Sequence, residues 1–340
     1  MDNNNIQNLT VSATPHIRSS VTTQSIMRDV IIALLPAAIM GVVLFGLQAA
    51  LVIVISVASC VFFEAIYQRL AKKPSTIGDL SAAVTGLLLA MNLPASCPFW
   101  VPIVGSFVAI IIAKQLFGGI GFNFINPALA GRAFLMASYP NEMMTYPETT
   151  FGVKGIVTNI DAISAATPLQ QIKGATEALV PTSQDYINAL VGNIGGCLGE
   201  TCAIALILGG IYLLARKIIS WHIPVCYIGT VFVLTVLFDA IGGEASFRVA
   251  TYELLAGGLM LGAFFMATDY TTSPMTDKGK MIYAVGCGLL TTIIRLYGGY
   301  PEGVSYSILI MNLVVPLIDR FCRQKKFGYV KPVKKKEEVK

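Results

Sequence analysis

Long apolar runs, separated by short polar turns, set the hydropathy pattern of this chain. A helix that crosses a membrane needs about 20 mostly apolar residues. Runs near this length cover residues 30–47, 49–67, 80–93, 99–115, 124–138, 189–214, 221–241, 252–268, 281–296 and 303–319. We therefore predict an all-α polytopic membrane protein with about ten transmembrane helices.

Two of the predicted spans, 80–93 and 124–138, are short for a full crossing. Short or broken helices are expected where the backbone lines an internal site instead of facing lipid. The stretch GFNFINPALAGR fits such a site, because Asn126-Pro127 can begin a broken helix whose free N–H groups point at a ligand. Close helix packing through small residues is the other interpretation.

The two halves of the chain resemble each other weakly. Residues 114–124 (KQLFGGIGFNF) resemble 294–304 (IRLYGGYPEGV), and 78–94 loosely match 252–268. These pairs align the chain as two halves of about five spans, and an odd number of crossings inverts one half relative to the other. Such inverted repeats build a site near the membrane midplane from broken helices, although duplication can also produce only a compact bundle.

The composition also indicates a lipid environment. Of 340 residues, 55% are hydrophobic and 13% are charged, whereas soluble domains carry about 25% charged residues. The seven cysteines include no C-x-x-C pair, so we predict neither a disulfide framework nor a zinc site, and we name no metal ligand. The polar N-terminus lacks the apolar core of a secretory signal peptide.

Basic residues mark one side of the membrane. The net charge of +5 is concentrated in the tail 320–340, and the turns 67–79, 214–220 and 269–280 add lysines or arginines on the same side. The loop 139–188 is mainly acidic. Counting positive charges therefore places the protein in the cell membrane with both termini cytoplasmic and this loop external. The topology explains the basic tail, and we expect no nucleic acid as a partner.

This threading divides the chain into a cytoplasmic N-terminal segment (1–29), a first membrane half (30–138), the external loop (139–188), a second membrane half (189–319) and a basic cytoplasmic tail (320–340).

The external loop contains the stretch DAISAATPL at residues 161–169. On spacing alone, this stretch is a Ser/Thr-rich turn that caps a helix, with Asp161 as the cap and Pro168 as the stop. It also places Ser164 and Thr167 about one helical turn apart, and the alanines between them leave room for a large ligand.

A family resemblance gives the stretch a second interpretation. Asp161-x-x-Ser164-x-Ala166-Thr167 resembles the signature D-x-x-[ST]-G-A-[ST], at which a flavin transferase attaches FMN. Three further stretches resemble the same family in the same order: TPHIRSSVTTQSIMRDVIIALLP (14–36), FGGIGFNFINPALAGRAFL (117–135) and FMATDYTTSPMTDKGK (265–280). Over nearly its whole length the chain resembles the D subunits of Rnf-type ion-translocating ferredoxin:NAD oxidoreductases, which are related to the B subunits of sodium-pumping NADH:quinone reductases.

The resemblance implies that Thr167 carries FMN through a phosphoester bond, with Asp161, Ser164 and Ala166 in the sequence around it. Ala165 departs from the signature, which has glycine there. The resemblance also implies a flavin transferase for maturation and a second, non-covalent flavin, such as riboflavin, near the broken helices. A hydroxyl can accept FMN from FAD by metal-assisted phosphoryl transfer, and the flavin ring then carries the electrons.

The implied function is that of a membrane subunit in an electron-transport complex. The subunit relays electrons between ferredoxin and NAD chemistry on other subunits, coupled to Na⁺ or H⁺ translocation. The chain has no dinucleotide fingerprint and no cysteine motif for an iron–sulfur cluster, so we expect a redox subunit and not a complete enzyme. The alternatives are a channel or secondary transporter for a small solute, and a scaffold subunit whose loop only docks a partner.

Charged residues inside or beside the spans are further candidates: Glu64, Arg132, Glu200, Asp269 and Arg295. An ionisable group at membrane depth is costly, so it is expected to face a partner, a cavity or an ion path. Glu64 and Asp269 resemble acidic positions of the cation path in the related quinone-reductase subunit; alternatively, both are solvated or salt-bridged at the cytoplasmic interface. Arg132 either caps the short helix or binds an anionic group of a cofactor.

Overall fold

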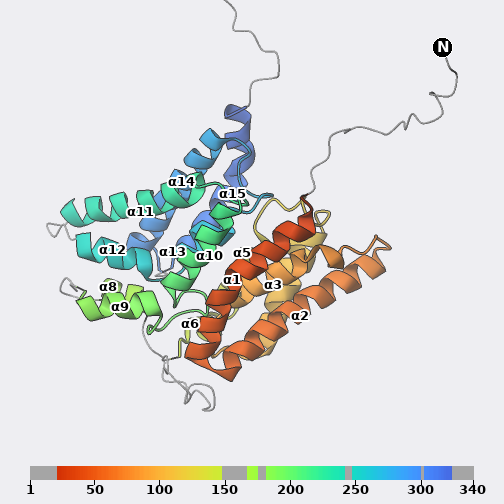
Figure 1. The fold of residues 1–340 in the computed structure, drawn as a ribbon, viewed down its shortest axis with the longest axis horizontal. Coiled ribbons are helices and arrows are strands. Elements are labelled where there is room, and N and C mark those ends of the chain that lie inside the picture. The colour runs from red at the N-terminus through yellow and green to blue at the C-terminus, as the bar shows by residue number, and fades with distance from the viewer. Residues whose placement is uncertain (1–20, 148–166, 175–180, 242–246, 300–301, 324–340) are drawn as a thin grey trace, which may run out of the picture.

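The computed structural model describes residues 21–147, 167–174, 181–241, 247–299 and 302–323, and within them the fold is all-helical, as predicted. Figure 1 shows two groups of helices, with the red-to-yellow N-terminal helices on one side and the green-to-blue C-terminal helices on the other. Helix α1 (Thr23–Phe45) packs along α10 (Ala203–Ala215), so these two helices join the groups.

The elements follow the order of the predicted spans. The N-terminal group comprises α1, α2 (Leu47–Leu70), the short η2 (Ile77–Asp79), α3 (Ser81–Met91), α4 (Trp100–Phe107), the π-helical η3 (Val108–Gln115), α5 (Pro127–Ser138) and α6 (Pro140–Met144). Next come α8 (Pro168–Gly174) and α9 (Ser183–Val191). The C-terminal group comprises α10, α11 (His222–Ile241), α12 (Phe247–Leu255), α13 (Leu259–Leu261), the π-helical η4 (Gly262–Met266), α14 (Asp277–Tyr297) and α15 (Val304–Phe321).

Within the described ranges, five helices are long and apolar enough to cross a membrane: α1, α2, α11, α14 and α15. A sixth candidate is the pair formed by α12 and the α13–η4 unit, which is bent by 64°. Helices α3, α4–η3 and α10 are apolar but shorter. Length and composition therefore support five or six spans, and the other predicted spans are short or broken helices.

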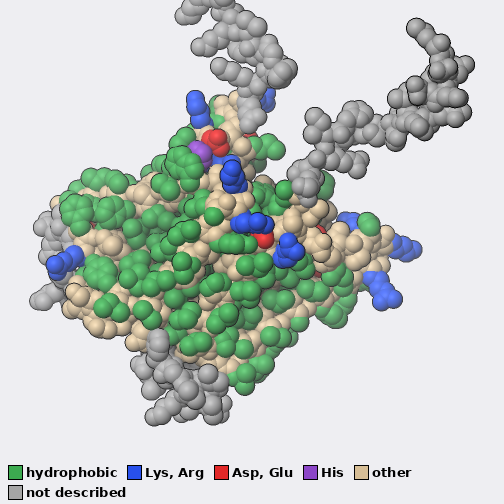
Figure 2. Space-filling view, in the orientation of Figure 1, with side chains coloured by type: hydrophobic (Ala, Val, Ile, Leu, Met, Phe, Trp, Pro, Cys, Tyr) green, Lys and Arg blue, Asp and Glu red, His purple; other side chains and the backbone are tan. Residues whose placement is uncertain are grey.

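The outward faces of the apolar helices carry exposed hydrophobic side chains. Ile39, Val54, Leu208, Val225 and Val233 each expose more than half of their surface, and hydrophobic side chains cover most of the face in Figure 2. So much exposed apolar area would be unfavourable in water, and it is the expected outer layer of a protein in lipid.

The first helix starts earlier than predicted. Instead of beginning near residue 30, α1 begins at Thr23, because Thr22 and Ser25 form a capping box. The Ser25 N–H donates to Thr22 Oγ1, and the Thr22 N–H donates to Ser25 Oγ, both at 3.2 Å. The first turn is too polar to register as part of an apolar run, but its cap fixes it as helix.

The predicted span 189–214 is broken. The chain instead forms α9, a non-helical segment at 192–202, and α10. Gly192 ends α9 with a left-handed φ of 104°. The Gly199 N–H donates to the Met91 carbonyl at the end of α3 (2.7 Å), and a Cβ at Gly199 would lie 2.8 Å from Met91 Cβ. Glycine therefore lets this segment pass close to the end of α3.

Helix α8 packs against the bend between α12 and α13. Gly257 lies in the bend with a left-handed φ of 77°. A Cβ at Gly257 would lie 2.7 Å from Leu169 Cδ1, so Leu169 of α8 packs directly against the break. This contact fixes the start of α8, and with it Thr167, beside the C-terminal helices.

Candidate functional site

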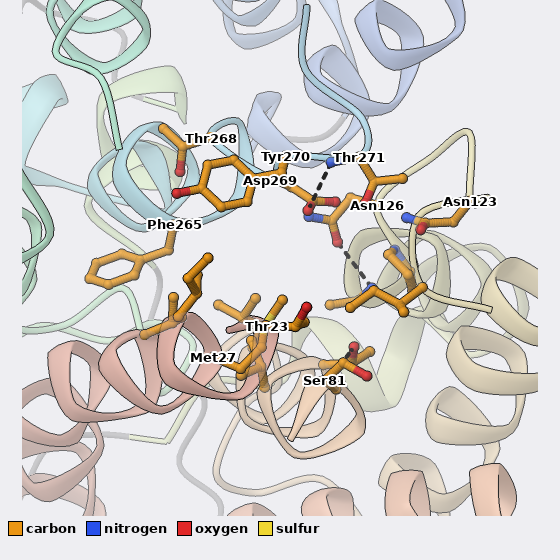
Figure 3. Close-up of a pocket in the computed structure, with 18 of the residues that line it drawn as sticks. Thr23, Met27, Ser81, Asn123, Asn126, Phe265, Thr268, Asp269, Tyr270 and Thr271 are labelled. Atoms are coloured by element: carbon orange, nitrogen blue, oxygen red, sulfur yellow. Dashed lines mark hydrogen bonds between the residues drawn. The ribbon is translucent and has the colours of Figure 1, made fainter. Parts of the chain in front are cut away.

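A pocket of 380 Å³ lies between the N-terminal ends of α1 and α3, the start of α5 and the segment after η4. Phe265 contributes to its apolar wall, and Ser81, Asn126 and Asp269 place polar groups around it (Figure 3). Both π-helical segments border the pocket, η3 through Lys114 and η4 through Phe265. An apolar cavity of this size with a few convergent polar groups is typical of a small-molecule site, and π-helical turns are frequent at functional sites.

Asn126 connects the pocket to the start of α5. Its side-chain oxygen accepts the N–H groups of Ala128 (3.0 Å) and Leu129 (3.3 Å), while Nδ2 donates to the Met266 carbonyl (3.2 Å). Because Asn126 is the N-cap and Pro127 occupies the first turn, the helix can begin inside the protein with its N–H groups satisfied. A short helix thus begins at Asn126-Pro127 and borders the pocket, as predicted. Its N–H groups at Ala128 and Leu129 are not free for a ligand, because Asn126 Oδ1 accepts both of them.

Asp269 also borders the pocket, in the segment between η4 and α14. Its carboxylate accepts the N–H of Thr271 (3.4 Å) and the hydroxyl of Thr272 (3.2 Å). Burial raises the pKa of Asp269, while these two hydrogen bonds and the charge of Lys114 act in the opposite direction. Asp269 is thus a pocket residue and is partly buried.

Glu64 lies in a buried polar cluster behind the pocket. Lys114 Nζ lies 2.9 and 3.2 Å from the two carboxylate oxygens of Glu64, and Gln115 Nε2 donates to the same carboxylate at 2.8 Å. Lys114 and Glu64 are 2% and 1% exposed. The Glu64 carboxylate is therefore salt-bridged and buried. Its partners Lys114 and Gln115 belong to η3, which forms the end of the fourth predicted span.

A second charged cluster is buried where the end of α3, the 192–202 segment and α5 meet. Arg132 Nη1 donates to Glu200 Oε1 (3.3 Å) and to Asn92 Oδ1 (2.8 Å), and Arg132 Nη2 donates to Glu302 Oε2. All three charged side chains are less than one-tenth exposed. One guanidinium therefore serves two carboxylates in the interior.

The capping role expected for Arg132 does not match this geometry. Asn126, not Arg132, caps α5, and the anionic groups that Arg132 binds are the protein's own carboxylates. Glu200 reaches Arg132 because the chain is not helical at 192–202 and turns Glu200 into the interior. The hydropathy pattern predicts a continuous helix there and therefore does not predict this pairing.

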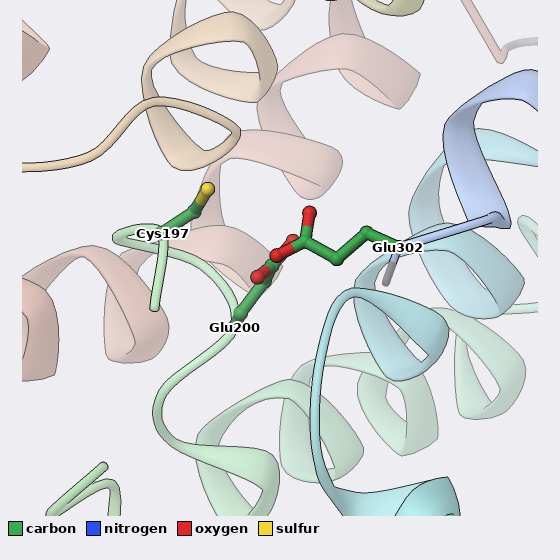
Figure 4. Close-up of side chains that lie close together, drawn as sticks. All are labelled: Cys197, Glu200 and Glu302. Atoms are coloured by element: carbon green, nitrogen blue, oxygen red, sulfur yellow. The ribbon is translucent and has the colours of Figure 1, made fainter. Parts of the chain in front are cut away.

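Three potential ligand atoms converge in this second cluster. The thiol of Cys197 and carboxylate oxygens of Glu200 and Glu302 lie within 4.8 Å of one another (Figure 4). The Arg132 guanidinium bonds both carboxylates and contacts Cys197 Sγ at 3.8 Å. The described geometry is thus an ion-pair cluster in which the cation is an arginine side chain.

Arg295 lies in the last turn of α14 and pairs with Glu253 of α12. Its Nη1 donates to the Glu253 carbonyl (3.0 Å) and lies 4.0 Å from the Glu253 carboxylate. Its Nε and Nη2 are buried and have no hydrogen-bond partner among the residues that the structure describes. Nη2 lies 3.7 Å from where a Cβ on Gly257 would stand, next to the position that Leu169 occupies.

Thr167 is the first described residue after position 147. Its Oγ1 accepts the Gln170 N–H (3.2 Å), its own N–H donates to Gln170 Oε1 (3.0 Å), and its side chain is buried. Thr167 therefore caps α8. Pro168, which the spacing had predicted to stop a helix, instead begins α8. Asp161, Ser164 and Ala166 lie outside the described residues.

The sequence reasoning missed Lys114 and Glu302. Lys114 interrupts the apolar run VAIIIAKQ, and a lysine at membrane depth was a usable signal. Glu302 stands in the glycine-containing sequence GGYPEG and carries no comparable pattern, so only the fold reveals its pairing with Arg132.

Comparison with known proteins decides the family. A model described as "NQR2, RnfD, RnfE family" matches residues 10–328 of the chain. The chain belongs to the NQR2, RnfD, RnfE family. The resemblance found in the sequence is thereby confirmed, and this family membership together with the apolar helices makes the chain a multi-pass membrane protein.

Relatives within this family are similar over nearly their whole length. The chain is 50% identical over 324 residues to the D subunit of the Na⁺-translocating ferredoxin:NAD⁺ oxidoreductase complex of Acetobacterium woodii, covering 95% of this chain and 96% of that one. It is 45% identical to the D subunit of the proton-translocating ferredoxin:NAD⁺ oxidoreductase complex of Clostridium ljungdahlii, covering 94% and 96%. It is 36% identical to the D subunit of the ion-translocating oxidoreductase complex of Halorhodospira halophila, covering 93% and 94%.

Proposed function

We propose that this chain is the D subunit of an ion-translocating ferredoxin:NAD oxidoreductase and relays electrons on flavin within that complex. The observation that carries the proposal is its 50% identity over nearly the full length to a subunit of that name. The other subunits of the complex are then its partners and hold the chemistry of ferredoxin and NAD. The electron relay drives Na⁺ or H⁺ across the membrane.

The proposed attachment point for FMN is Thr167, within the motif at 161–167. Its hydroxyl is buried and caps α8, so the flavin transferase acts while the start of α8 is undocked. After esterification, the oxygen retains lone pairs and can still accept the Gln170 N–H. FMN supplies one- and two-electron redox chemistry when attached, and the packing of Leu169 on Gly257 holds its anchor in place.

The pocket of 380 Å³ is the proposed site of the second, non-covalent flavin. A flavin ring has apolar faces and a hydrogen-bonding edge. Phe265 offers an apolar surface, while Asn123 and Asn126 offer amide groups at the pocket wall, so the residues present fit such a ring. They would bind and orient it, and the surrounding helices would exclude water.

The two proposed flavin positions lie at opposite ends of α14. The pocket includes the segment that precedes α14, and Thr167 lies near the C-terminal turn of α14 through Leu169 and Gly257. A helix of this length spans roughly 30 Å, about the thickness of a bilayer core. Such a separation suits a subunit that moves electrons across the membrane.

The two groups of helices support the proposed inverted five-helix halves. In the first group α2 packs on α3 and α4, and α4 and η3 pack on α5. In the second group α11 packs on α12 and α14, and α14 packs on α15. With both termini cytoplasmic, the pocket, Glu64 and Asp269 lie towards the cytoplasm, where cations of the ion path would enter, and α8 and α9 lie outside.

Replacement of Thr167 tests the covalent flavin. Thr167→Val in the complex, produced with the transferase, is expected to abolish flavin fluorescence from this subunit on a denaturing gel, while Thr167→Ser keeps it because a hydroxyl remains. Mass spectrometry of the peptide around Thr167 should show FMN in the wild type. A bare peptide in active native complex would refute the covalent attachment, and transport of a solute by the isolated, colourless chain would favour the channel hypothesis.

A further inference from the structure

Lys114 stands between the pocket and the buried carboxylate of Glu64. Its Nζ contacts both Glu64 oxygens (2.9 and 3.2 Å) and Ser81 Oγ (2.7 Å), and both Lys114 and Ser81 line the pocket. A single ammonium group therefore contacts the carboxylate on one side and borders the pocket on the other. The Lys114 stem is flexible, with rotatable bonds that allow the ammonium to move.

Lys114 can pair either with Glu64 or with a negative charge inside the pocket. Of the described residues that line the pocket, Lys114 is the only basic one and Asp269 the only acidic one. Glu64 pairs with Lys114 on the side away from the pocket, and the positive charge of Lys114 also interacts with Asp269. A further negative charge inside the pocket would compete with Glu64 for the same ammonium group.

The other partners of Glu64 are neutral and bind one oxygen. Gln68 Nε2, Gln115 Nε2 and Thr76 Oγ1 donate to Oε1, at 3.2, 2.8 and 3.2 Å. Oε2 has Lys114 as its partner (2.9 Å). If Lys114 turned away, Oε2 would lose its counter-charge, and an anionic carboxylate oxygen is a ligand that hard cations prefer.

We propose that Lys114 couples the charge of the pocket flavin to cation binding at Glu64. The inference rests on the non-covalent flavin of the proposed function. While the flavin is uncharged, Lys114 pairs with Glu64. Two electrons from the relay and one proton leave the flavin with a charge of −1, Lys114 turns towards it, and Glu64 binds one monovalent cation. Lys114 stays protonated throughout, so charge balances.

The test uses the full chain purified in detergent with Thr167→Val, so that riboflavin, the added probe, is the flavin measured. Absorbance first establishes that riboflavin binds. Its midpoint potential is then measured against Na⁺ concentration at fixed pH. Binding of one cation per two electrons raises the potential by about 30 mV for each tenfold increase in the cation.

A pH series at fixed Na⁺ distinguishes the proton from Na⁺ as the cation. The flavin's own proton gives about 30 mV per pH unit, and a coupled proton at Glu64 would raise this slope to about 59 mV. The titratable groups that face this region are Lys114 from η3, Cys60 one turn earlier on α2, and Asp269 across the pocket. In the wild-type chain, the midpoint potential must therefore show an additional dependence of about 30 mV per tenfold change in either Na⁺ or proton concentration. We call this dependence the added slope.

Variants identify the residues that carry the slope. Glu64→Gln removes the cation site, and Lys114→Gln leaves it open in both redox states, so both are expected to abolish the added slope. They differ in the oxidised state, in which Lys114→Gln should bind the cation at least about tenfold more tightly than wild type, a change of 1.4 kcal/mol. Lys114→Arg keeps the charge and should keep the slope. Lys73→Gln, at an exposed lysine near the same end of α2, is the matched control.

The outcomes separate this inference from the function it rests on. A wild-type chain with bound riboflavin and no added slope overturns the coupling, even if a variant fails to fold. Retention of the slope in Lys114→Gln or Glu64→Gln also overturns it. Failure of riboflavin to bind refutes both the second flavin and the coupling, whereas the FMN on Thr167 is judged separately from the wild-type peptide mass.

Discussion

At the scale of single residues, buried charges meet opposite charges brought from distant parts of the sequence. Glu64 meets Lys114, and Arg132 meets Glu200 and Glu302. Isolated charges in a low-dielectric interior are very costly, so each pair depends strongly on both partners. The energetic consequence is greatest for Arg132, because one cation serves two carboxylates.

Arg132→Met is expected to lower the free energy of unfolding by about 3–5 kcal/mol, since it leaves Glu200 and Glu302 unpaired inside the protein. Thermal unfolding in detergent measures the loss. Adding Glu200→Gln and Glu302→Gln should recover part of the stability, because neutral side chains no longer need the guanidinium. Arg320→Met, at an exposed arginine, is the control and should change little; equal losses in the two single variants would contradict the argument.

At the scale of elements, close approaches and local breaks build the polar clusters. The π-helical η3 carries Lys114 to Glu64, and the broken segment 192–202 carries Glu200 to Arg132. Glycine makes the tight contacts between helices possible. Gly86 of α3 is the clearest case, because a Cβ there would lie 2.7 Å from Val57 Cα and 2.9 Å from the Ser56 carbonyl oxygen of α2.

Gly86→Ala is therefore expected to destabilise the protein by about 1–3 kcal/mol, because backbone atoms of α2 must move away. Gly229→Ala in α11 is the matched control: apart from the backbone of its own helix, no atom of the described residues lies within 4 Å of its Cβ position, and alanine favours a helix by about 1 kcal/mol. Thermal unfolding should fall for the first variant and stay level or rise for the second. A fall for Gly229→Ala as large as that for Gly86→Ala would be inconsistent with a packing cause.

At the scale of the whole molecule, the helices place the pocket and Thr167 at opposite ends of α14. The described basic residues near the pocket end include Lys73, Arg216, Lys217, Lys278 and Lys280. A basic end of this kind favours the cytoplasm. The orientation we propose therefore places the pocket inside and α8 and α9 outside.

Labelling of introduced cysteines tests this orientation. In a chain whose native cysteines are replaced, Ser183→Cys in α9 should react with a membrane-impermeant maleimide on intact cells. Lys278→Cys in α14 should react only after the cells are permeabilised. Both native side chains are exposed in the fold, so access to each site is set by the membrane. The reversed labelling pattern would exclude the proposed topology.

The hydropathy pattern predicted much of the fold because lipid imposes a simple requirement on each helix separately. The runs at 49–67, 221–241 and 303–319 correspond closely to α2, α11 and α15. The same pattern failed at 189–214, because Gly192 and the close approach of Gly199 to Met91 end the helix without lowering the hydropathy.

The sequence by itself determined the membrane class and the family, and it singled out Glu64, Asp269 and Asn126 as candidate site residues, since composition, motifs and isolated charges in apolar runs are local properties. Only the tertiary structure decided that Lys114 joins Glu64 to the pocket and that Arg132 serves two carboxylates. Those contacts join residues 50 to 170 positions apart. Their pairing follows from helix packing and backbone breaks, and no local pattern in the chain encodes it.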